Sequence, residues 1–241
     1  ASRESLRRHA PALPVTILCF GDIDLGDLEA EVERRGSYEH SLDEHAATLG
    51  GYPVLHKWIG LAQIAAAPHE QLLYLDNDTY ICADLDPLFT AHAEHDFYAR
   101  EEPFTMRSPH GYDPEYVDEL ALASLAYGQG CKAIPPYNLG VVLLNNGLCG
   151  RLGAVLPDLL AFAARFAQGT LPYPSSNRWI IEQVALWLSL GRIEGLTHGL
   201  LDRSLVAQDD EFLATSSAAV VHYFSRNTDA FLGSTDAPGA A

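Results

Sequence analysis

Short apolar runs alternate along this chain with segments of helical length. The strand candidates are residues 15–20, 72–81, 97–99, 139–144 and 218–224. The helix candidates between them are residues 25–35, 55–67, 152–167 and 179–190. Strands separated by helices predict an α/β fold with a mostly parallel central sheet flanked by helices, in which ligands bind at the carboxyl ends of the strands.

The length of the chain is that of one domain. It has 241 residues, of which 48% are hydrophobic and 20% charged, a composition typical of water-soluble globular proteins. A chain of this size buries about 70–75% of its unfolded surface, so it needs neither a disulfide nor a structural metal for stability. We expect a single domain over residues 1–241, with a frayed tail at 226–241 and an insertion at 101–136. Long loops of this kind commonly form a binding wall.

The charge of the chain excludes one broad class of partner. It has 15 basic and 32 acidic residues, a formal net charge of -17. A surface this acidic repels a phosphate backbone, so we expect no binding of nucleic acid. An acidic protein that binds one phosphorylated small molecule needs a local cation, and a metal ion held by carboxylates is the usual device.

The cysteines and the apolar segments bear on the compartment. The four cysteines, Cys19, Cys82, Cys131 and Cys149, form no Cys-x-x-Cys pair, so we expect free thiols and a reducing cytoplasm. No apolar stretch reaches the ~18–20 residues of a membrane-spanning helix. The first ten residues lack the apolar region of a signal peptide. We therefore expect a cytoplasmic protein, and the abundance of alanine and of arginine over lysine indicates a bacterial source.

Asp76–Asn77–Asp78 is the most informative local motif. It follows the apolar run LLYL, and residues i and i+2 of an extended segment project to the same side. Both carboxylates are then expected to face one point at the end of a buried strand, where they repel each other unless a proton or a cation lies between them. Mg²⁺ and Mn²⁺ prefer such oxygen ligands. The alternative is an ordinary turn at a strand end, where Asp and Asn are common.

His222 is the candidate for a third metal ligand. It lies within the last apolar strand candidate, where a lone histidine is often a core residue with satisfied hydrogen bonds. Two carboxylates leave a metal ion short of ligands, however, and a neutral imidazole suits Mn²⁺. Both interpretations of His222 stay open at the level of sequence.

Two families share the string LLYLDNDTYI. It fits the first motif of the haloacid-dehalogenase-like phosphatases, in which the first acid, here Asp76, is a nucleophile. That motif normally opens the catalytic domain, whereas residues 1–71 precede it here. The string also resembles the metal motif of the A-type glycosyltransferases, in particular the retaining family-eight enzymes.

The glycosyltransferase resemblance covers roughly residues 15–225 and rests on five places in the order and spacing of that family. They are Lys57 in the helix before the acidic strand, DNDTYICADLDPLF, YNLGVVLLNN with Asn138 and Gly140, the Glu182–Gln183 pair, and His222 in VVHYFS. Each of these residues also has a purely structural interpretation, as a solvated helix residue, a turn former or a core side chain.

The resemblance implies a nucleotide-diphospho-sugar transferase-like fold and the metal-dependent transfer of a sugar, with retention, from a nucleoside-diphosphate sugar to an acceptor hydroxyl. It implies a UDP-sugar as donor, a saccharide or other hydroxylated acceptor, and residues 101–136 as the acceptor wall. The implied ligands of Mn²⁺ or Mg²⁺ are Asp76, Asp78 and His222. The implied donor-binding residues are Lys57, Asp76, Asn77, Asp78, Asn138 and Gly140, and the implied catalytic residues are Asn138, Glu182 and Gln183.

Two features of the family are missing from the sequence. No strand candidate precedes Val15 to hold the nucleotide base, and no Lys-Pro-Trp follows His222, where HYFSRNTDAF offers Arg226 instead. These departures favour one alternative, a catalytically silent glycosyltransferase-like binding protein. The other alternative is the dehalogenase-like phosphatase that uses Asp76 as its nucleophile.

Overall fold

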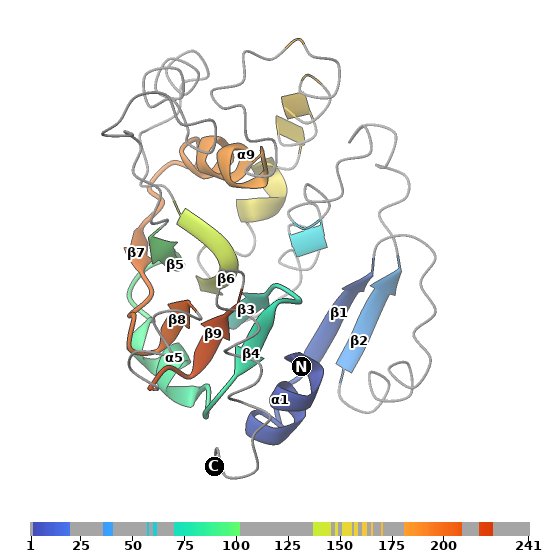
Figure 1. The fold of residues 1–241 in the computed structure, drawn as a ribbon. Coiled ribbons are helices and arrows are strands. Elements are labelled where there is room, and N and C mark those ends of the chain that lie inside the picture. The colour runs from blue at the N-terminus through green and yellow to red at the C-terminus, as the bar shows by residue number, and fades with distance from the viewer. Residues whose placement is uncertain are drawn as a thin grey trace, which may run out of the picture.

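The structure is a computed structural model of the chain (Figure 1). It describes residues 2–19, 36–40, 57, 60–61, 70–101, 137–145, 148, 151–155, 157–158, 161–162, 165, 170, 181–208 and 217–223. The predicted helix at 25–35, most of the insertion at 101–136 and the tail at 226–241 lie outside these residues.

The central strand of the fold is β6 (Tyr137–Asn145), and all nine of its residues are buried. Its sequence YNLGVVLLN has no polar alternation in the middle, which is typical of a strand covered on both faces. β3 (Gln71–Leu75) pairs antiparallel with one side of β6 and β5 (Phe97–Glu101) with the other. β7 (His198–Leu200) adds to β5 in parallel and completes a sheet of order β3-β6-β5-β7.

A second sheet has the order β4-β9-β8. Its strands are β4 (Thr79–Ile81), β8 (Val206–Gln208) and β9 (Val220–His222). β9 pairs antiparallel with β4 and parallel with β8. Because β3 belongs to the first sheet and β4 to the second, the short segment between them carries the chain from one sheet to the other.

One hydrophobic cluster joins the two sheets. It includes Val141 and Leu143 of β6, Val206 of β8 and Val220 of β9, all at most 1% exposed. Leu88 of the short helix α5 (Asp86–Ala91) packs into the same cluster. Full burial of one such side chain contributes about 1.5–3 kcal/mol, so this cluster fixes the position of β9 against β6.

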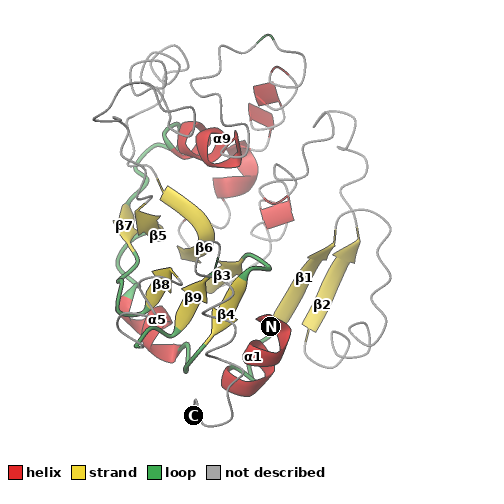
Figure 2. Ribbon diagram, viewed as in Figure 1, coloured by secondary structure: helices red, strands yellow, loops and turns green. Residues whose placement is uncertain are grey.

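Helices cover the sheets at two places (Figure 2). α1 (Ser2–His9) packs against β4, and the buried Ser5 Oγ accepts a hydrogen bond of 2.9 Å from the backbone N–H of Ile81. β4 is an edge strand, so this side chain satisfies a donor that the sheet leaves unpaired. α9 (Ile181–Leu190) contacts β6, and its residues 185–190 are all buried.

The remaining described elements are β1 (Val15–Cys19) and β2 (Gly36–His40), which pair in parallel, and the short 3-10 helix η2 (Gly153–Val155). In the part of the chain that the structure describes, every helix is too short or too polar to span a bilayer.

The α/β class with a central sheet and flanking helices is confirmed, and four of the five predicted strands appear within a few residues of their expected positions. Two details differ. The predicted strand at 72–81 is two strands, β3 and β4, in different sheets. The described pairings are also mixed rather than mostly parallel: three are parallel and three antiparallel. An apolar run specifies burial, but it carries no information on strand direction.

Candidate metal centre

The segment Asp76–Asn77–Asp78 is a tight turn between β3 and β4. The backbone N–H of Asp76 donates to the carbonyl of Gly140 at 2.8 Å, which continues the β3–β6 ladder by one rung. Thr79 Oγ1 donates to the carbonyl of Asp76 at 2.7 Å, and the N–H of Tyr223 donates to the carbonyl of Asp78 at 2.9 Å. The turn is therefore fixed from both sheets.

Asp76 and Asp78 lie close together, but the cause is this turn and not the alternation of side chains along a strand. We expected Asp76 and Asp78 to face one way because alternate residues of a strand do so. The strand ends at Leu75, however, and the reversal at Asn77 and Asp78 brings the carboxylates together. A turn at this position is thus not an alternative to a metal site, because the turn itself brings the two carboxylates together.

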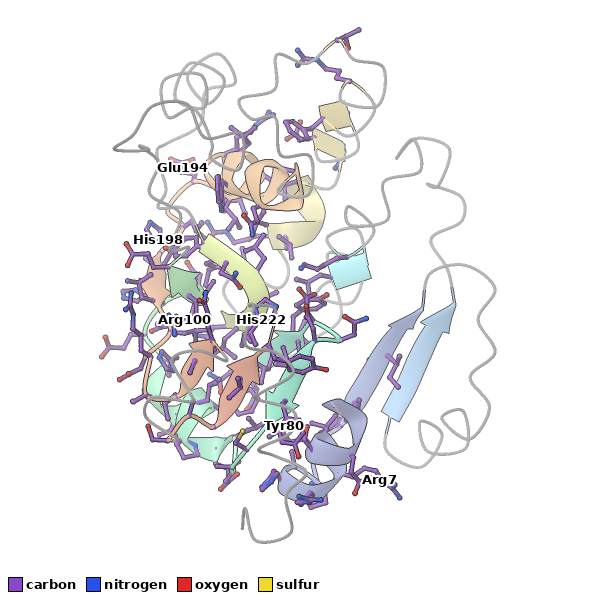
Figure 3. The ribbon with its side chains drawn as sticks, viewed as in Figure 1. Arg7, Tyr80, Arg100, Glu194, His198 and His222 are labelled. Atoms are coloured by element: carbon purple, nitrogen blue, oxygen red, sulfur yellow. The ribbon has the colours of Figure 1, made fainter. Side chains whose placement is uncertain are left out.

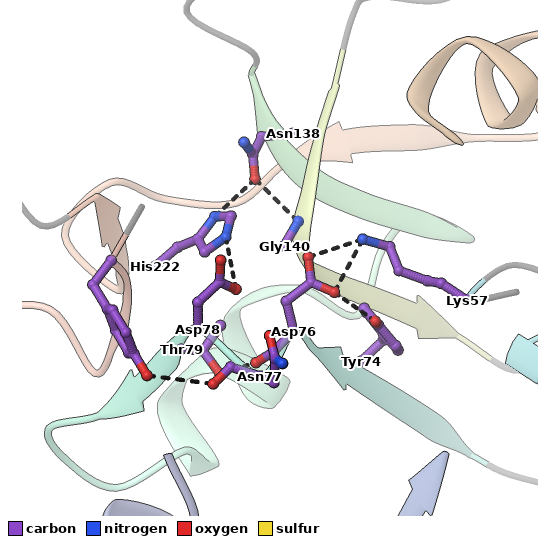
Figure 4. Close-up of polar contacts among 10 residues, drawn as sticks. Lys57, Tyr74, Asp76, Asn77, Asp78, Thr79, Asn138, Gly140 and His222 are labelled. Carbon is purple, nitrogen blue, oxygen red and sulfur yellow. Dashed lines mark hydrogen bonds and ion pairs between the residues drawn. The ribbon is translucent and has the colours of Figure 1, made fainter. Parts of the chain in front are cut away.

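Register places His222 beside the acidic pair. His222 is paired with Thr79 across β9 and β4. Its ring therefore lies next to Asp78, the residue before Thr79. Asp76, Asp78 and His222 each offer one ligand atom, and these three atoms lie within 4.8 Å of one another (Figure 4). Figure 3 shows His222 in the interior, between β9 and β6, whereas Arg7 and Glu194 lie at the periphery.

Most of the hydrogen-bonding capacity of Asp76 is used. Lys57 Nζ donates to both carboxylate oxygens, at 2.9 and 3.0 Å, and the hydroxyl of Tyr74 donates to Oδ1 at 2.5 Å. A carboxylate offers about four lone-pair positions, so about one remains for a further partner. Asp76 can therefore give a cation one oxygen without losing these three bonds.

Lys57 is a buried cation. Its side chain is 7% exposed and that of Asp76 is 22% exposed. A buried ammonium is tolerated when a carboxylate neutralises it and accepts its hydrogen bonds. The ammonium also lies 5.3 Å from the centre of the Tyr74 ring. Lys57 is thus part of the cluster, and the interpretation as a solvated helix residue is wrong.

Asp78 has an oxygen without a hydrogen bond. Its Oδ1 is buried and accepts none, although His222 Nε2 lies 3.2 Å away. Burial by itself raises the pKa of a carboxyl, but His222 and, to a smaller extent, Lys57 outweigh burial, so the pKa of Asp78 lies below its ordinary value. Asp78 is therefore an anion at neutral pH with one buried oxygen available as a ligand.

The ring of His222 lies directly on Gly140. A Cβ placed on residue 140 would be 2.1, 2.3 and 2.5 Å from three atoms of the imidazole, so only glycine fits there. At the same edge of the ring, His222 Nδ1 lies 3.1 Å from Asn138 Oδ1. The glycine that we expected to bind a donor or shape a turn makes room for the histidine.

The remaining predicted residues lie around this cluster or outside it. Asn77 is exposed in the turn, and its carbonyl accepts a hydrogen bond of 3.3 Å from the hydroxyl of Tyr223. Gln183 is half-buried in the first turn of α9 and is not among the contacts above. The side chain of Glu182 lies outside the described residues. The roles predicted for Glu182 and Gln183 stay predictions.

Sequence reasoning missed Tyr74. Its hydroxyl binds Asp76 because residues 74 and 76 lie two apart at the end of β3 and project to the same side. The predicted strand at 72–81 already puts Tyr74 and Asp76 on one side, so the sequence does carry this signal.

The three residues fit a hard divalent cation. The set holds two carboxylates and one imidazole, which suits Mn²⁺ and, with more added oxygen ligands, Mg²⁺. Neighbouring ligands in an octahedral site at about 2.1 Å from the ion lie about 3 Å apart. The 3.2 Å between His222 Nε2 and Asp78 Oδ1 is close to that separation, and the unsatisfied Oδ1 would gain a partner.

Comparison with known proteins gives distant similarity only. No family model and no curated protein matches the chain. Among solved structures, it is similar to a glycosyltransferase involved in the glycosylation of the major capsid of PBCV-1, with 15% identity, 92% of this chain and 98% of that chain covered, and a TM-score of 0.45. It is also similar to mouse xyloside xylosyltransferase 1 in its apo form, with 14% identity, coverages of 94% and 91%, and a TM-score of 0.48.

Proposed function

We propose that this chain is a metal-dependent glycosyltransferase of the A type, which moves a sugar from a nucleoside-diphosphate sugar to an acceptor hydroxyl. The observation that carries the proposal is the meeting of Asp76, Asp78 and His222 beside the buried Lys57. We further propose the retaining family-eight type of chemistry, Mn²⁺ as the ion and a UDP-sugar as the donor, on the five motifs that support that resemblance.

The charge of the site suits a diphosphate leaving group. Asp76 and Asp78 contribute two negative charges and Lys57 one positive charge, which leaves a sum of minus one. A bound divalent cation stabilises the negative charge that develops on the diphosphate as the bond to the sugar breaks. The local sum then becomes plus one, which makes this the place where a chain of net charge -17 attracts a diphosphate.

The residues of the chain have separate tasks in this proposal. Lys57 holds Asp76 in place and adds positive charge near the phosphates. Asn77, exposed at the turn, contacts the donor from outside the cluster. Glu182 and Gln183, at the start of α9, bind hydroxyls of the sugar or acceptor, because orientation of the reactants lowers the barrier by several kcal/mol.

The phosphatase alternative needs Asp76 as a nucleophile. A nucleophilic carboxylate presents a free oxygen to phosphorus, whereas Oδ1 of Asp76 accepts from both Tyr74 and Lys57 and Oδ2 also accepts from Lys57. This arrangement suits a held ligand better than an attacking group. The same experiment below separates the two functions.

The test measures nucleotide release from a panel of UDP- and GDP-sugars, with Mn²⁺ and with a saccharide acceptor or water. We expect turnover that a chelator abolishes and that Asp78→Asn reduces by at least about a hundredfold, since the ligand loses its charge. Glu94→Gln, a change at an exposed acid after α5, is the matched control and keeps full activity.

Each contrary outcome has a definite meaning. Turnover that survives both the chelator and Asp78→Asn rejects the metal role. Mg²⁺-dependent release of phosphate from an aryl phosphate, lost in Asp76→Asn, establishes the phosphatase instead. Metal-dependent binding of a nucleoside diphosphate without turnover of any donor favours the silent binding protein.

A further inference from the structure

The hydrogen bonds of Asn138 define the orientation of its amide group. The backbone N–H of Gly140 lies 3.0 Å from the Asn138 side-chain atom that faces it. A backbone N–H can only donate, so that atom has to be the amide oxygen, Oδ1. This contact, two residues along the buried strand β6, fixes which end of the amide faces the cluster.

The same oxygen determines where the proton of His222 lies. Asn138 Oδ1 is 3.1 Å from His222 Nδ1, and an amide oxygen only accepts hydrogen bonds. Nδ1 therefore carries the hydrogen. In a neutral imidazole the other nitrogen, Nε2, is then left with a lone pair.

That lone pair points at the acidic pair. His222 Nε2 faces Asp78 Oδ1 at 3.2 Å, which is an ion pair when the ring is protonated. When the ring is neutral and its hydrogen is on Nδ1, two acceptors face each other here, and the buried Oδ1 receives no hydrogen bond. Two acceptors at this distance repel unless a cation binds both.

We propose that Asn138 is a positioning residue that holds His222 in the Nδ1–H tautomer and so presents Nε2 to the metal ion. The inference rests on the proposed function and replaces the direct role in sugar binding that we expected for Asn138. Histidine ligands commonly donate their second ring N–H to an oxygen acceptor, and loss of that acceptor typically weakens metal binding about 10–100-fold.

The physical reason for the effect is competition for Asp78. Without an acceptor at residue 138, the proton can move to Nε2, where Asp78 Oδ1 at 3.2 Å accepts it. The acid and the histidine then satisfy each other, and neither offers its lone pair to a cation.

The experiment combines two measurements on the full chain. Calorimetric titration with Mn²⁺ alone gives the metal affinity, and long-range ¹H–¹⁵N spectra of the histidine side chains at about pH 8 report the tautomer of His222. His222→Gln identifies its signals. Asn138→Leu removes the acceptor at similar size, and Asn138→Asp keeps an oxygen at the same place.

We expect the wild-type protein to give the Nδ1–H pattern and to bind Mn²⁺. Asn138→Leu should change the pattern to Nε2–H and raise the Kd for Mn²⁺ by about 10–100-fold. Asn138→Asp should retain the Nδ1–H pattern and bind Mn²⁺ at least as tightly as the wild type. A merely structural role of Asn138 would not move the tautomer. Asn138→Ala, which adds no bulk, replaces Asn138→Leu if the latter does not fold.

The outcomes separate this inference from the proposed function. If His222→Gln weakens Mn²⁺ binding while Asn138→Leu leaves both the tautomer and the Kd unchanged, the positioning role is wrong and the metal site stands. If the wild-type protein binds no Mn²⁺ in a way that depends on His222, the proposed function fails, and the metal-presenting role of Asn138 fails with it.

Discussion

Lys57 and Asp76 form a buried ion pair in which one ammonium binds both carboxylate oxygens, at 2.9 and 3.0 Å. The pair joins a helical residue to the end of β3, 19 positions later in the chain. It neutralises one of the two acids of the cluster before any cation binds. The affinity of the site for a metal ion and its affinity for a phosphate should therefore respond to Lys57 in opposite directions.

Lys57→Met should tighten the binding of free Mn²⁺ and weaken the binding of UDP in the presence of Mn²⁺. The local charge falls from minus one to minus two, which favours the cation, and the diphosphate loses a positive neighbour. Hydrogen bonds to charged groups are worth about 1.5–3 kcal/mol, so each Kd should change by roughly tenfold or more. Calorimetric titrations with Mn²⁺ alone, and with UDP at saturating Mn²⁺, measure the two effects.

Lys57→Arg keeps the positive charge on a larger, planar head, so it separates the charge from the fit of the side chain. The Kd for free Mn²⁺ should not fall in Lys57→Arg, because the local charge stays at minus one. A Lys57→Met protein in which both affinities weaken together would contradict the charge argument and indicate a general loss of the site.

Gly140→Ala should disrupt the metal centre. The added Cβ would lie 2.1–2.5 Å from three ring atoms of His222, so the imidazole has to move away from Asp78. Buried rings that are forced off their positions typically cost about 1–3 kcal/mol in stability. We expect a lower melting temperature in thermal unfolding and at least a tenfold higher Kd for Mn²⁺ in calorimetry.

Gly195→Ala is the comparison for this change. Gly195 has φ of +66°, and nothing lies within 4 Å of an added Cβ. Its substitution should cost about 1 kcal/mol through backbone strain and leave Mn²⁺ binding unaltered. If both alanine variants lose stability equally and both keep the metal, the packing of His222 on Gly140 has no role in the site.

The parts of the fold that depend on local composition could be predicted from the sequence. β6 could be predicted because its apolar run is unbroken, and the three candidate ligands could be named because acids follow β3 and a histidine ends the last core strand. The run at 72–81 was predicted as one buried strand that ends at an acidic edge. That edge is present after Leu75, but residues 79–81 form a second strand in the other sheet, which the apolar pattern alone could not distinguish.

The detail of the site depends on contacts between distant residues. Asn138 and His222 are 84 positions apart and meet only because β9 packs against β6. The reason for a glycine at residue 140 is likewise a side chain from another sheet. Neither relationship leaves a local signal, so the sequence could name these residues but not their partners.

Cys82 should react slowly with alkylating reagents. It is a free thiol just after β4, and burial raises the pKa of Cys82 to about 11. The thiolate is the reactive form, so at pH 8, three units lower, only about one thiol in a thousand is ionised. Mass-spectrometric mapping after treatment with iodoacetamide should show the rate at Cys82 rising about tenfold per pH unit up to roughly pH 10. A rate at pH 8 equal to that of a free cysteine would contradict the burial of this thiol.

Ser5→Ala should destabilise the fold without changing the metal site. The variant leaves the buried N–H of Ile81 without its acceptor at the outer edge of β4, which costs about 1–3 kcal/mol. For a chain of this size the melting temperature should fall by roughly 2–4 °C per kcal/mol. Ile81 is the last residue of β4, whereas Asp78 directly precedes Thr79, the first residue of β4. The change at Ser5 is thus at the far end of the strand from the metal site, and the Kd of the folded variant for Mn²⁺ should stay within about twofold of the wild-type value.

Ser217→Ala, at an exposed serine before β9, is the control and should have the melting temperature of the wild type. A Ser5→Ala protein as stable as that control would show that α1 does not protect the edge of the second sheet.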